Sequence, residues 1–174
     1  MTTIIMHTSE GDIRINLFDT KAPHTVENFL GLATGKKEWT DPFTGQPSHE
    51  KFYDGLTFHR IIKDFMIQGG CPDGNGMGDP GWSIEGEFAS NGFTNNLKHT
   101  RGVLSMARRG DSYDSGSCQF FICHQDCAHL DGSYAAFGRV TEGIEVVDEI
   151  CNAETDESDR PKEDIIIKEI KIIE

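Results

Sequence analysis

The sequence predicts a mainly β protein with two helices. The chain has 174 residues, enough to bury a hydrophobic core in one domain. Its 36% hydrophobic content and 19 glycines favour a loop-rich β protein over a helical bundle. Short β-branched and aromatic runs bounded by turn residues recur along the chain, whereas only two segments show helical spacing.

A hairpin is predicted at the N-terminus. Strands at 4–7 and 13–18 flank a turn at 9–12, where serine, glycine and aspartate are typical turn residues. Strict alternation along the second strand defines the face that should point into the core. That face consists of Ile13, Ile15 and Leu17.

Helical spacing predicts one helix after this hairpin and another near the C-terminus. Pro23 starts the first helix, because its missing N–H donor is harmless in a first turn, and Gly35 ends it. Its apolar face consists of Val26, Phe29, Leu30 and Ala33. The second helix is marked by Ile144, Val147, Ile150 and Cys151. A polar loop follows the first helix and contains Pro42, Gly45 and Pro47.

Three short strands are predicted in the middle of the chain, at 56–62, 65–70 and 119–123. A charged loop at 154–164 leads to a β-branched strand at 165–172. We expect this last strand to pair with the first and close the sheet, which would remove its exposed edges.

Arg60 stands where the strand pattern asks for an apolar side chain, since alternation puts it on one face with Leu56, Phe58 and Ile62. A guanidinium stays charged and is costly to bury without partners. Arg60 is therefore turned outward by a bulge, paired with a carboxylate, or held on an apolar surface for use. The ordinary alternative is a salt-bridged arginine whose stem lies on apolar surface.

The neighbouring strands supply further groups for a ligand site. Alternation places Met66 and Gln68 on the same face of their strand, and it places Gln119 and Phe121 on the same face of theirs. With Arg60 these strands offer a cation, two amides, aromatic rings and a thioether, which suits a shallow apolar pocket with a few polar groups. Core packing of the apolar side chains and backbone hydrogen bonding by the glutamines are the alternatives.

Six ordered motifs then span the chain: FHRII at 58–62, FMIQGG at 65–70, GVLSMA at 102–107, QFFIC at 119–123, LDG at 130–132 and FGRV at 137–140. Together they resemble the cyclophilin family of peptidyl-prolyl cis–trans isomerases. The resemblance runs from about Thr3 to the C-terminus. It implies a closed eight-stranded antiparallel β-barrel capped by two α-helices, with residues 1–174 as a single isomerase domain.

The resemblance and the chemistry of the reaction together assign roles. The barrier to rotating a peptide bond comes from C–N double-bond character, so the catalyst must favour the twisted amide. Arg60 is expected to donate to the nitrogen of that amide, and Gln68 to bind a substrate carbonyl. The reaction requires no cofactor and no metal. The substrate-binding residues are expected to be Phe65, Met66, Ala107, Arg108, Gln119, Phe121, His129, Leu130 and Tyr134.

The chain departs from the family pattern at three positions beside the expected pocket. His129 replaces a frequent tryptophan, Tyr134 a frequent histidine and Arg108 a frequent asparagine. The missing tryptophan predicts weaker cyclosporin binding. The pair Arg108 and Arg109 predicts a bias toward acidic substrate segments, with solvated loop charges as the alternative.

Charge and composition limit partners and compartment. A formal net charge of −13 disfavours nucleic acid and anionic membrane surfaces, leaving proline-containing peptides and unfolded proteins as the expected partners. Residues 1–6 have no charged start and no long apolar run, and five irregularly spaced cysteines fit a reducing compartment. We therefore expect a cytoplasmic protein, and nothing in the sequence demands an oligomer.

Two other signals are weaker. The cluster Cys123, His124, Cys127 and His129 lacks the spacing of a zinc finger, and Cys118 and Cys123 are expected to be buried as small apolar residues. The glycine-rich run 74–78 lacks the Lys-Ser/Thr ending of a phosphate loop. Three function classes are left: a prolyl isomerase, a binding module for proline peptides without turnover, and a metal- or redox-regulated sensor.

Overall fold

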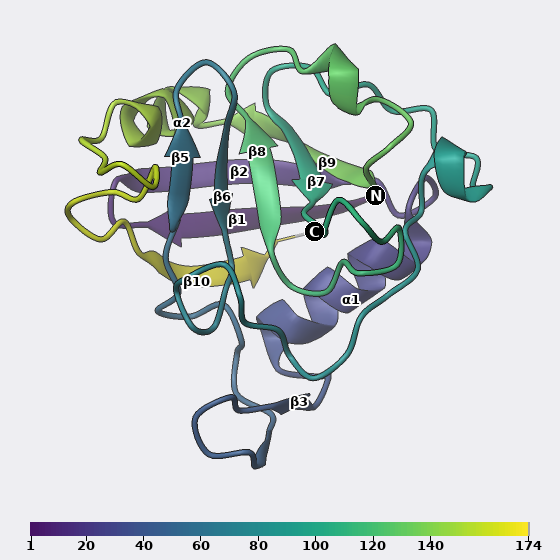
Figure 1. The fold of residues 1–174 in the computed structure, drawn as a ribbon, viewed down its shortest axis with the longest axis horizontal. Coiled ribbons are helices and arrows are strands. Elements are labelled where there is room, and N and C mark those ends of the chain that lie inside the picture. Colours follow the sequence, from purple (N-terminus) through teal and green to yellow (C-terminus); the bar gives the residue numbers. More distant parts are fainter. Residues whose placement is uncertain (174) are drawn as a thin grey trace.

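The computed structural model describes residues 1–173. Eight antiparallel strands form one curved sheet in the order β10-β1-β2-β9-β7-β8-β6-β5 (Figure 1). Its strands are β1 (Thr2–Thr8), β2 (Gly11–Leu17), β5 (Arg60–Ile62), β6 (Met66–Gly69), β7 (Val103–Met106), β8 (Phe120–Cys123), β9 (Ala136–Glu142) and β10 (Ile167–Ile172). The helices are α1 (Pro23–Thr34) and α2 (Ile144–Cys151), with 3-10 turns at Ala89–Asn91 and Ala128–Leu130.

The N-terminal hairpin is confirmed, with a shorter turn than predicted. β1 and β2 pair along their whole length, so only Ser9 and Glu10 connect them. Two-residue connections are favoured in hairpins because their twist matches that of the paired strands. The predicted inward residues Ile13, Ile15 and Leu17 are all fully buried.

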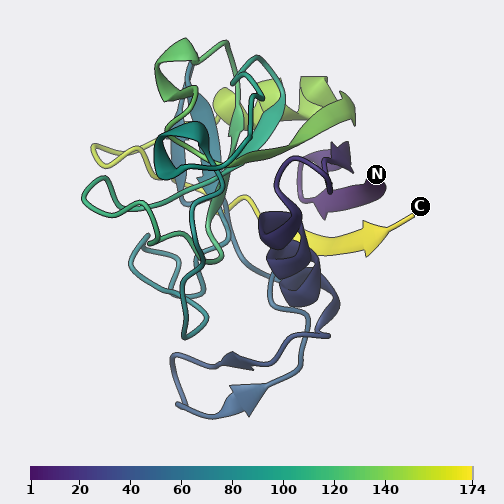
Figure 2. The same ribbon diagram turned by 90° about the vertical axis from the view of Figure 1, so that its right-hand side faces the viewer.

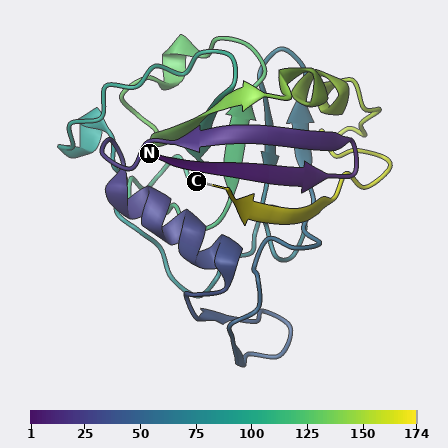
Figure 3. The same ribbon diagram turned by 180° about the vertical axis from the view of Figure 1, so that it is seen from behind.

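Both predicted helices are present. α1 begins at Pro23 and ends at Gly35, whose left-handed φ of 79° lets its N–H bond to the Leu32 carbonyl. α1 and α2 lie at opposite ends of the sheet (Figure 1). Seen from behind, α1 crosses below the strands β1, β2 and β10 (Figure 3), and it contacts β10 while α2 contacts β2, β5 and β6.

The barrel is less fully closed than predicted. The expected pairing of the last strand with the first is confirmed, since β10 pairs with β1. The two edges of the sheet, β10 and β5, share no ladder. A single bridge between Thr57 and Ile166 joins them, beside a bond of 3.0 Å from the Phe58 N–H to the Ile165 carbonyl. Closure therefore relies on a few backbone hydrogen bonds outside the regular strands.

This closure changes the strand predicted at 56–62. Only Arg60–Ile62 forms a strand, and Phe58 is fully buried in the core whereas Arg60 is exposed. The prediction that Phe58 and Arg60 share a face is therefore wrong. Residues before β5 bond to the segment preceding β10, and this irregular stretch resets the alternation. Within β5, Ile61 points into the core and pairs with Ile67 of β6.

The polar loop after α1 contains a small hairpin that the sequence analysis missed. β3 (Trp39–Thr40) pairs with β4 (Pro47–Ser48), and the hairpin projects away from the barrel (Figure 2). Trp39 packs edge-on against Phe52, with ring centroids 4.9 Å apart, while Phe43 at the tip is 80% exposed. Two-residue strands carry too little pattern to be seen in a sequence.

Aromatic side chains fill the interior between α1 and the sheet. Phe29 of α1 lies 5.0 Å from Tyr53, 5.7 Å from Phe120 and 5.4 Å from Phe137, measured between ring centroids. These four rings are fully buried. Along residues 1–173, none of the helices has the length and apolar character needed to cross a membrane.

Candidate functional site

A cavity of about 130 Å³ opens on the outer face of strands β5, β6 and β8. Nine residues line it, and all nine were predicted as site residues: Arg60, Phe65, Met66, Gln68, Ala107, Arg108, Phe121, Leu130 and Tyr134. Two further predicted residues, Gln119 and His129, do not line this cavity. The structure thus gathers residues that are up to 74 positions apart in the chain around one hollow, from Arg60 to Tyr134.

Strand alternation explains why apolar side chains lie on this outer face. Ile67 and Phe120 belong to the interior core, whereas Met66 and Phe121 belong to a second apolar cluster outside the sheet. Met66 is 2% and Phe121 4% exposed. Because these side chains are almost completely packed, they form a rigid apolar floor, which we call the seat: Met66, Phe121 and Leu130.

Arg60 lies at the edge of the cavity without a counter-ion. Its Nη1 donates to Oε1 of Gln68 at 3.3 Å, because register places Arg60 directly opposite Gln68. Within residues 1–173, no carboxylate lies within ion-pair distance of Arg60. The irregular stretch before β5 turns Arg60 outward, as the first predicted alternative has it, and places it beside an apolar surface, as the third has it.

A chain of amide hydrogen bonds supports Arg60. Gln68 Nε2 donates to Oε1 of Gln119 at 3.0 Å, and Gln119 Nε2 donates to the carbonyls of Gly76 at 2.9 Å and Gly78 at 3.2 Å. These contacts orient both amides and leave the Gln68 side chain facing the cavity. We call Arg60, Gln68 and Gln119 the polar arm. Gln119, predicted as a substrate contact, is tied to the glycine-rich loop and lines a second cavity beside the first.

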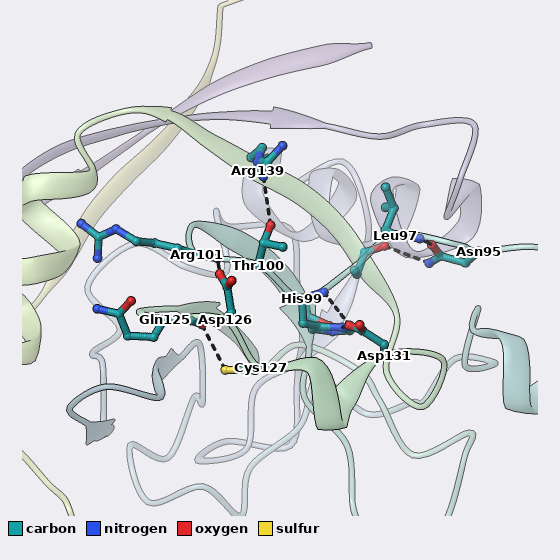
Figure 4. A network of polar contacts seen from close by, with 12 residues as sticks. Asn95, Leu97, His99, Thr100, Arg101, Gln125, Asp126, Cys127, Asp131 and Arg139 are labelled. Atoms are coloured by element: carbon teal, nitrogen blue, oxygen red, sulfur yellow. Dashed lines mark hydrogen bonds and ion pairs between the residues drawn. The ribbon is translucent and has the colours of Figure 1, made fainter.

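The seat rests on a buried histidine that the sequence analysis missed. The His99 ring stacks on Phe121, with centroids 6.0 Å apart and planes 17° apart. His99 Nε2 lies 2.8 Å from the Ser105 hydroxyl, and Nδ1 lies 3.1 Å from Oδ1 of Asp131, toward which it points (Figure 4). Serine, histidine and aspartate also form hydrolase triads, but Ser105 is fully buried on β7, out of reach of a substrate.

Burial and hydrogen bonding oppose each other at His99 and at Asp131, and the pKa of each residue ends below its ordinary value. Burial lowers the pKa of His99 below its ordinary value, although the bond to Asp131 acts the other way. Burial acts to raise the pKa of Asp131, but backbone and side-chain hydrogen bonds from His99 outweigh it and hold that pKa below its ordinary value. The arrangement suits a neutral ring that donates from Nδ1 and accepts the Ser105 proton at Nε2.

The wall carrying Phe65 is fixed by a second histidine. The turn before Phe65 includes Asp64, whose φ of 65° is unusual for a residue with a side chain. The Asp64 N–H donates to Nδ1 of His124 at 2.9 Å, and the His124 N–H donates to the Phe65 carbonyl at 2.8 Å. His124 Nε2 in turn lies 3.0 Å from Asp148 of α2, which also takes a bidentate pair from Arg101. Helix α2 thereby anchors the cavity wall.

Comparison with known proteins agrees with this geometry. A sequence profile of the family described as cyclophilin type peptidyl-prolyl cis-trans isomerase/CLD matches residues 3–172. The chain belongs to the cyclophilin family. It is 42% identical over 171 residues to peptidyl-prolyl cis-trans isomerase B of Streptomyces anulatus, covering 96% of this chain and 94% of that protein. It is also 42% identical over 174 residues to probable peptidyl-prolyl cis-trans isomerase A of Mycobacterium leprae, covering 98% and 91%.

A solved cyclophilin confirms the fold. The crystal structure of a cyclophilin type peptidyl-prolyl cis-trans isomerase of Cryptosporidium parvum, in the presence of the dipeptide Ala-Pro, matches with a TM-score of 0.83. The two chains are 31% identical, and the match covers 99% of each. This cyclophilin is therefore an isomerase that acts on peptide bonds preceding proline, as the sequence predicted.

Two of the positions where this cyclophilin departs from the family pattern differ in their contact with the cavity. His129 is exposed and packs against Phe65, with ring centroids 5.6 Å apart, and it does not line the cavity. Tyr134 lines the cavity and meets Phe121 edge-on at 5.8 Å. In the same 3-10 turn Leu130 lines the cavity, and the role predicted for His129 in substrate binding stays a prediction.

The cysteines near the site are buried, and among the described residues they are not arranged for metal or redox chemistry. All five cysteines are buried free thiols, and burial raises the pKa of Cys118 to about 12. Burial likewise raises the pKa of Cys123 and Cys127. The part of the chain that the structure describes holds no group of three or more His, Cys, Asp or Glu arranged for a metal ion. Thiols with raised pKa values are poor nucleophiles at neutral pH.

Proposed function

We propose that the 130 Å³ cavity binds the proline ring and that Arg60 assists rotation about the preceding bond. The observation that carries this proposal is an unpaired guanidinium beside a rigid apolar seat. When the amide twists, its conjugation is lost and the nitrogen lone pair localises, so the nitrogen can accept a hydrogen bond. A donor fixed at that point stabilises the twisted state more than either planar form.

The seat holds the ring while the rest of the bond turns. Met66, Phe121 and Leu130 are at most 8% exposed, so their surface is shaped before a substrate arrives. Phe65 and Tyr134 supply the side walls. Preorganised apolar contacts cost little ordering entropy on binding, so a small contact surface is enough to hold the ring.

The backbone next to the seat supports an extended substrate. The Ala107 N–H already donates to the Gln119 carbonyl at 3.0 Å. Neighbouring residues of an extended chain direct their backbone groups to opposite sides, so a peptide strand added here would pair through the N–H and the carbonyl of Arg108. Such β-addition contacts are largely independent of substrate sequence. We propose flexible or unfolded chains as substrates, because a folded chain seldom presents an extended X-Pro segment.

The test compares isomerisation of a short X-Pro peptide by the wild type and by Arg60→Ala. Losing the donor should cost ~2.7–4 kcal/mol of barrier, about 10²–10³ in kcat/KM, by analogy with a removed oxyanion donor. Arg139→Ala is the matched control, because Arg139 is an exposed arginine on β9 that bonds Thr100 and does not line the cavity. An Arg60→Ala enzyme as fast as the control would remove Arg60 from the mechanism.

Some expectations concern partners and compartment. We keep weaker cyclosporin binding as a proposal, since the residue in the tryptophan position, His129, contacts Phe65 from outside the cavity. The net charge of −13 supports the absence of nucleic-acid and membrane partners. Five free cysteines support the cytoplasm as the compartment. A monomer is proposed because nothing in the sequence demands an oligomer.

A further inference from the structure

Arg108 carries a guanidinium that is fixed by the surrounding backbone. Its Nε and Nη2 donate to the Ser133 carbonyl at 3.0 and 2.8 Å, and Nη1 donates to the Arg109 carbonyl at 3.0 Å. The first two bonds use one edge of the planar group and the third uses another, and together they hold its orientation. The side chain has therefore already lost most of the rotational freedom that a surface arginine would lose on binding a ligand.

Aromatic rings enclose the same guanidinium. Its Cζ lies 4.4 Å from the ring centroid of Tyr134 and 5.2 Å from those of Phe88 and Tyr113. Contacts of this kind stabilise the cation without neutralising it. Tyr134 also forms part of the cavity wall, so the packing places the charge next to the proposed proline site.

Arg108 and its neighbour Arg109 differ sharply. Arg109 is 73% exposed at its side chain and pairs with Asp111, its Nε lying 3.3 Å from Oδ1. Arg108 is partly buried, and across residues 1–173 no carboxylate comes within ion-pair distance of it. An uncompensated cation in a protein of net charge −13 is available for an anionic ligand.

The position of Arg108 indicates which part of a substrate would meet it. A second cavity of about 240 Å³ adjoins the first. Gln68, Ala107 and Arg108 line both cavities, and Arg109, whose charge is paired with Asp111, lines the second together with Asp79. In an extended chain, residues two positions apart project to the same side. With proline in the seat, the side chain two residues away would therefore point toward the second cavity, with Arg108 between the two.

We infer that Arg108 makes the enzyme selective for substrates with an acidic side chain two residues from the proline. This inference rests on the proposed function, because it takes the first cavity as the proline site. A carboxylate there would accept the remaining N–H groups of a preorganised guanidinium. A lysine at the same position would face a like charge that cannot move away.

The experiment uses six short peptides, each with one X-Pro bond and with Glu, Gln or Lys two residues before or two residues after proline. Exchange NMR gives kcat/KM for the wild type, Arg108→Gln, Arg108→Lys and Arg109→Gln. We expect the wild type to favour Glu over Lys by about fivefold on one side of proline, the range of a partly exposed ion pair. Arg108→Gln should bring the ratio near one, Arg108→Lys should keep part of it, and Arg109→Gln should leave it unchanged.

A wild-type ratio near one on both sides, an unchanged ratio in Arg108→Gln, or a ratio lost in Arg109→Gln would overturn the inference. Turnover of the Gln peptides shows whether each variant keeps a working site. If Arg108→Gln does not fold, the wild type and Arg108→Lys provide the test instead. The preference of both proteins for Glu over Lys should then decrease as the salt concentration rises from about 50 to about 500 mM, because salt screens the ion pair. Loss of Gln-peptide turnover in Arg60→Ala tests the proposed function separately, since it does not involve the charge ratio.

Discussion

The seat lines one cavity together with Arg60 and Gln68 of the polar arm, but the seat and the arm are held in different ways. Phe121 is 4% exposed and stacks on the buried His99. Arg60 is exposed and is oriented by one bond of 3.3 Å to Gln68. The seat is fixed by close packing, whereas the arm is fixed by a few side-chain hydrogen bonds.

This difference separates stability from turnover. Packed side chains contribute several kcal/mol to folding, whereas an exposed hydrogen bond contributes about 1 kcal/mol or less. Changes in the seat should therefore reduce stability together with substrate binding. Changes in the arm should reduce the rate of isomerisation while the protein stays as stable as before.

Phe121→Ala should give the largest effect. Removing a buried phenylalanine costs ~3–5 kcal/mol in the free energy of unfolding and takes away the ring that proline would contact. Chemical denaturation and peptide titration measure the two consequences. Phe43→Ala is the control, because Phe43 is 80% exposed and its loss should change neither quantity. Equal stability of the two variants would contradict a packed seat.

The next largest effect is expected at His59, on the pH dependence of the free energy of unfolding. Its ring is 7% exposed, and burial together with Arg160 and Arg60 lowers its pKa from 6.5 to about 4. Between these values the unfolded chain binds a proton that the folded protein excludes. The free energy of unfolding should therefore fall as pH drops from about 6.5 to about 4, by ~3 kcal/mol from this group.

His59→Gln should remove that part of the slope, because glutamine does not titrate. Thermal or urea unfolding at intervals from pH 7 to pH 4 measures it. His24→Gln serves for comparison, because His24 is an exposed residue at the start of α1. The buried-histidine account fails if the slopes of wild type and His59→Gln coincide.

Asp131→Asn should have a smaller effect through the support of the seat. The amide can keep an oxygen for the His99 N–H, which donates to Asp131 at 2.6 Å, but it removes the charge opposite the ring. We expect a loss of about 1 kcal/mol in stability and weaker peptide binding with little change in kcat. A fall in kcat without a loss of peptide affinity would instead show that Asp131 supports the polar arm.

Gln119→Leu should have the smallest effect on stability and act on rate. It breaks the bond from Gln68 at 3.0 Å and those to Gly76 and Gly78, so Arg60 and Gln68 lose their orientation. We expect a several-fold fall in kcat, with a melting temperature close to that of the wild type, since the side chain is only partly buried. An unchanged kcat would show that the arm needs no support from the glycine-rich loop.

The sequence predicted the seat better than its support. Met66, Gln68 and Phe121 follow from alternation, because the ladder between β6 and β8 is regular and one face must turn away from the core. The local pattern places Phe58 and Arg60 on one face, because it does not show the break in alternation between them. That break comes from closure against residues near Ile166, which are distant in sequence. No local pattern places His99 beneath Phe121 or His129 against Phe65.

The most direct test of the central claim measures affinity and rate on the same Arg60→Ala sample. Peptide titration followed by NMR gives the dissociation constant, and exchange spectroscopy gives the rate of isomerisation on the enzyme. If the arm acts only on the twisted amide, affinity should stay within about twofold of the wild type, while the rate falls about 10²–10³. A parallel loss of affinity and rate, or a rate left intact, would contradict the claim.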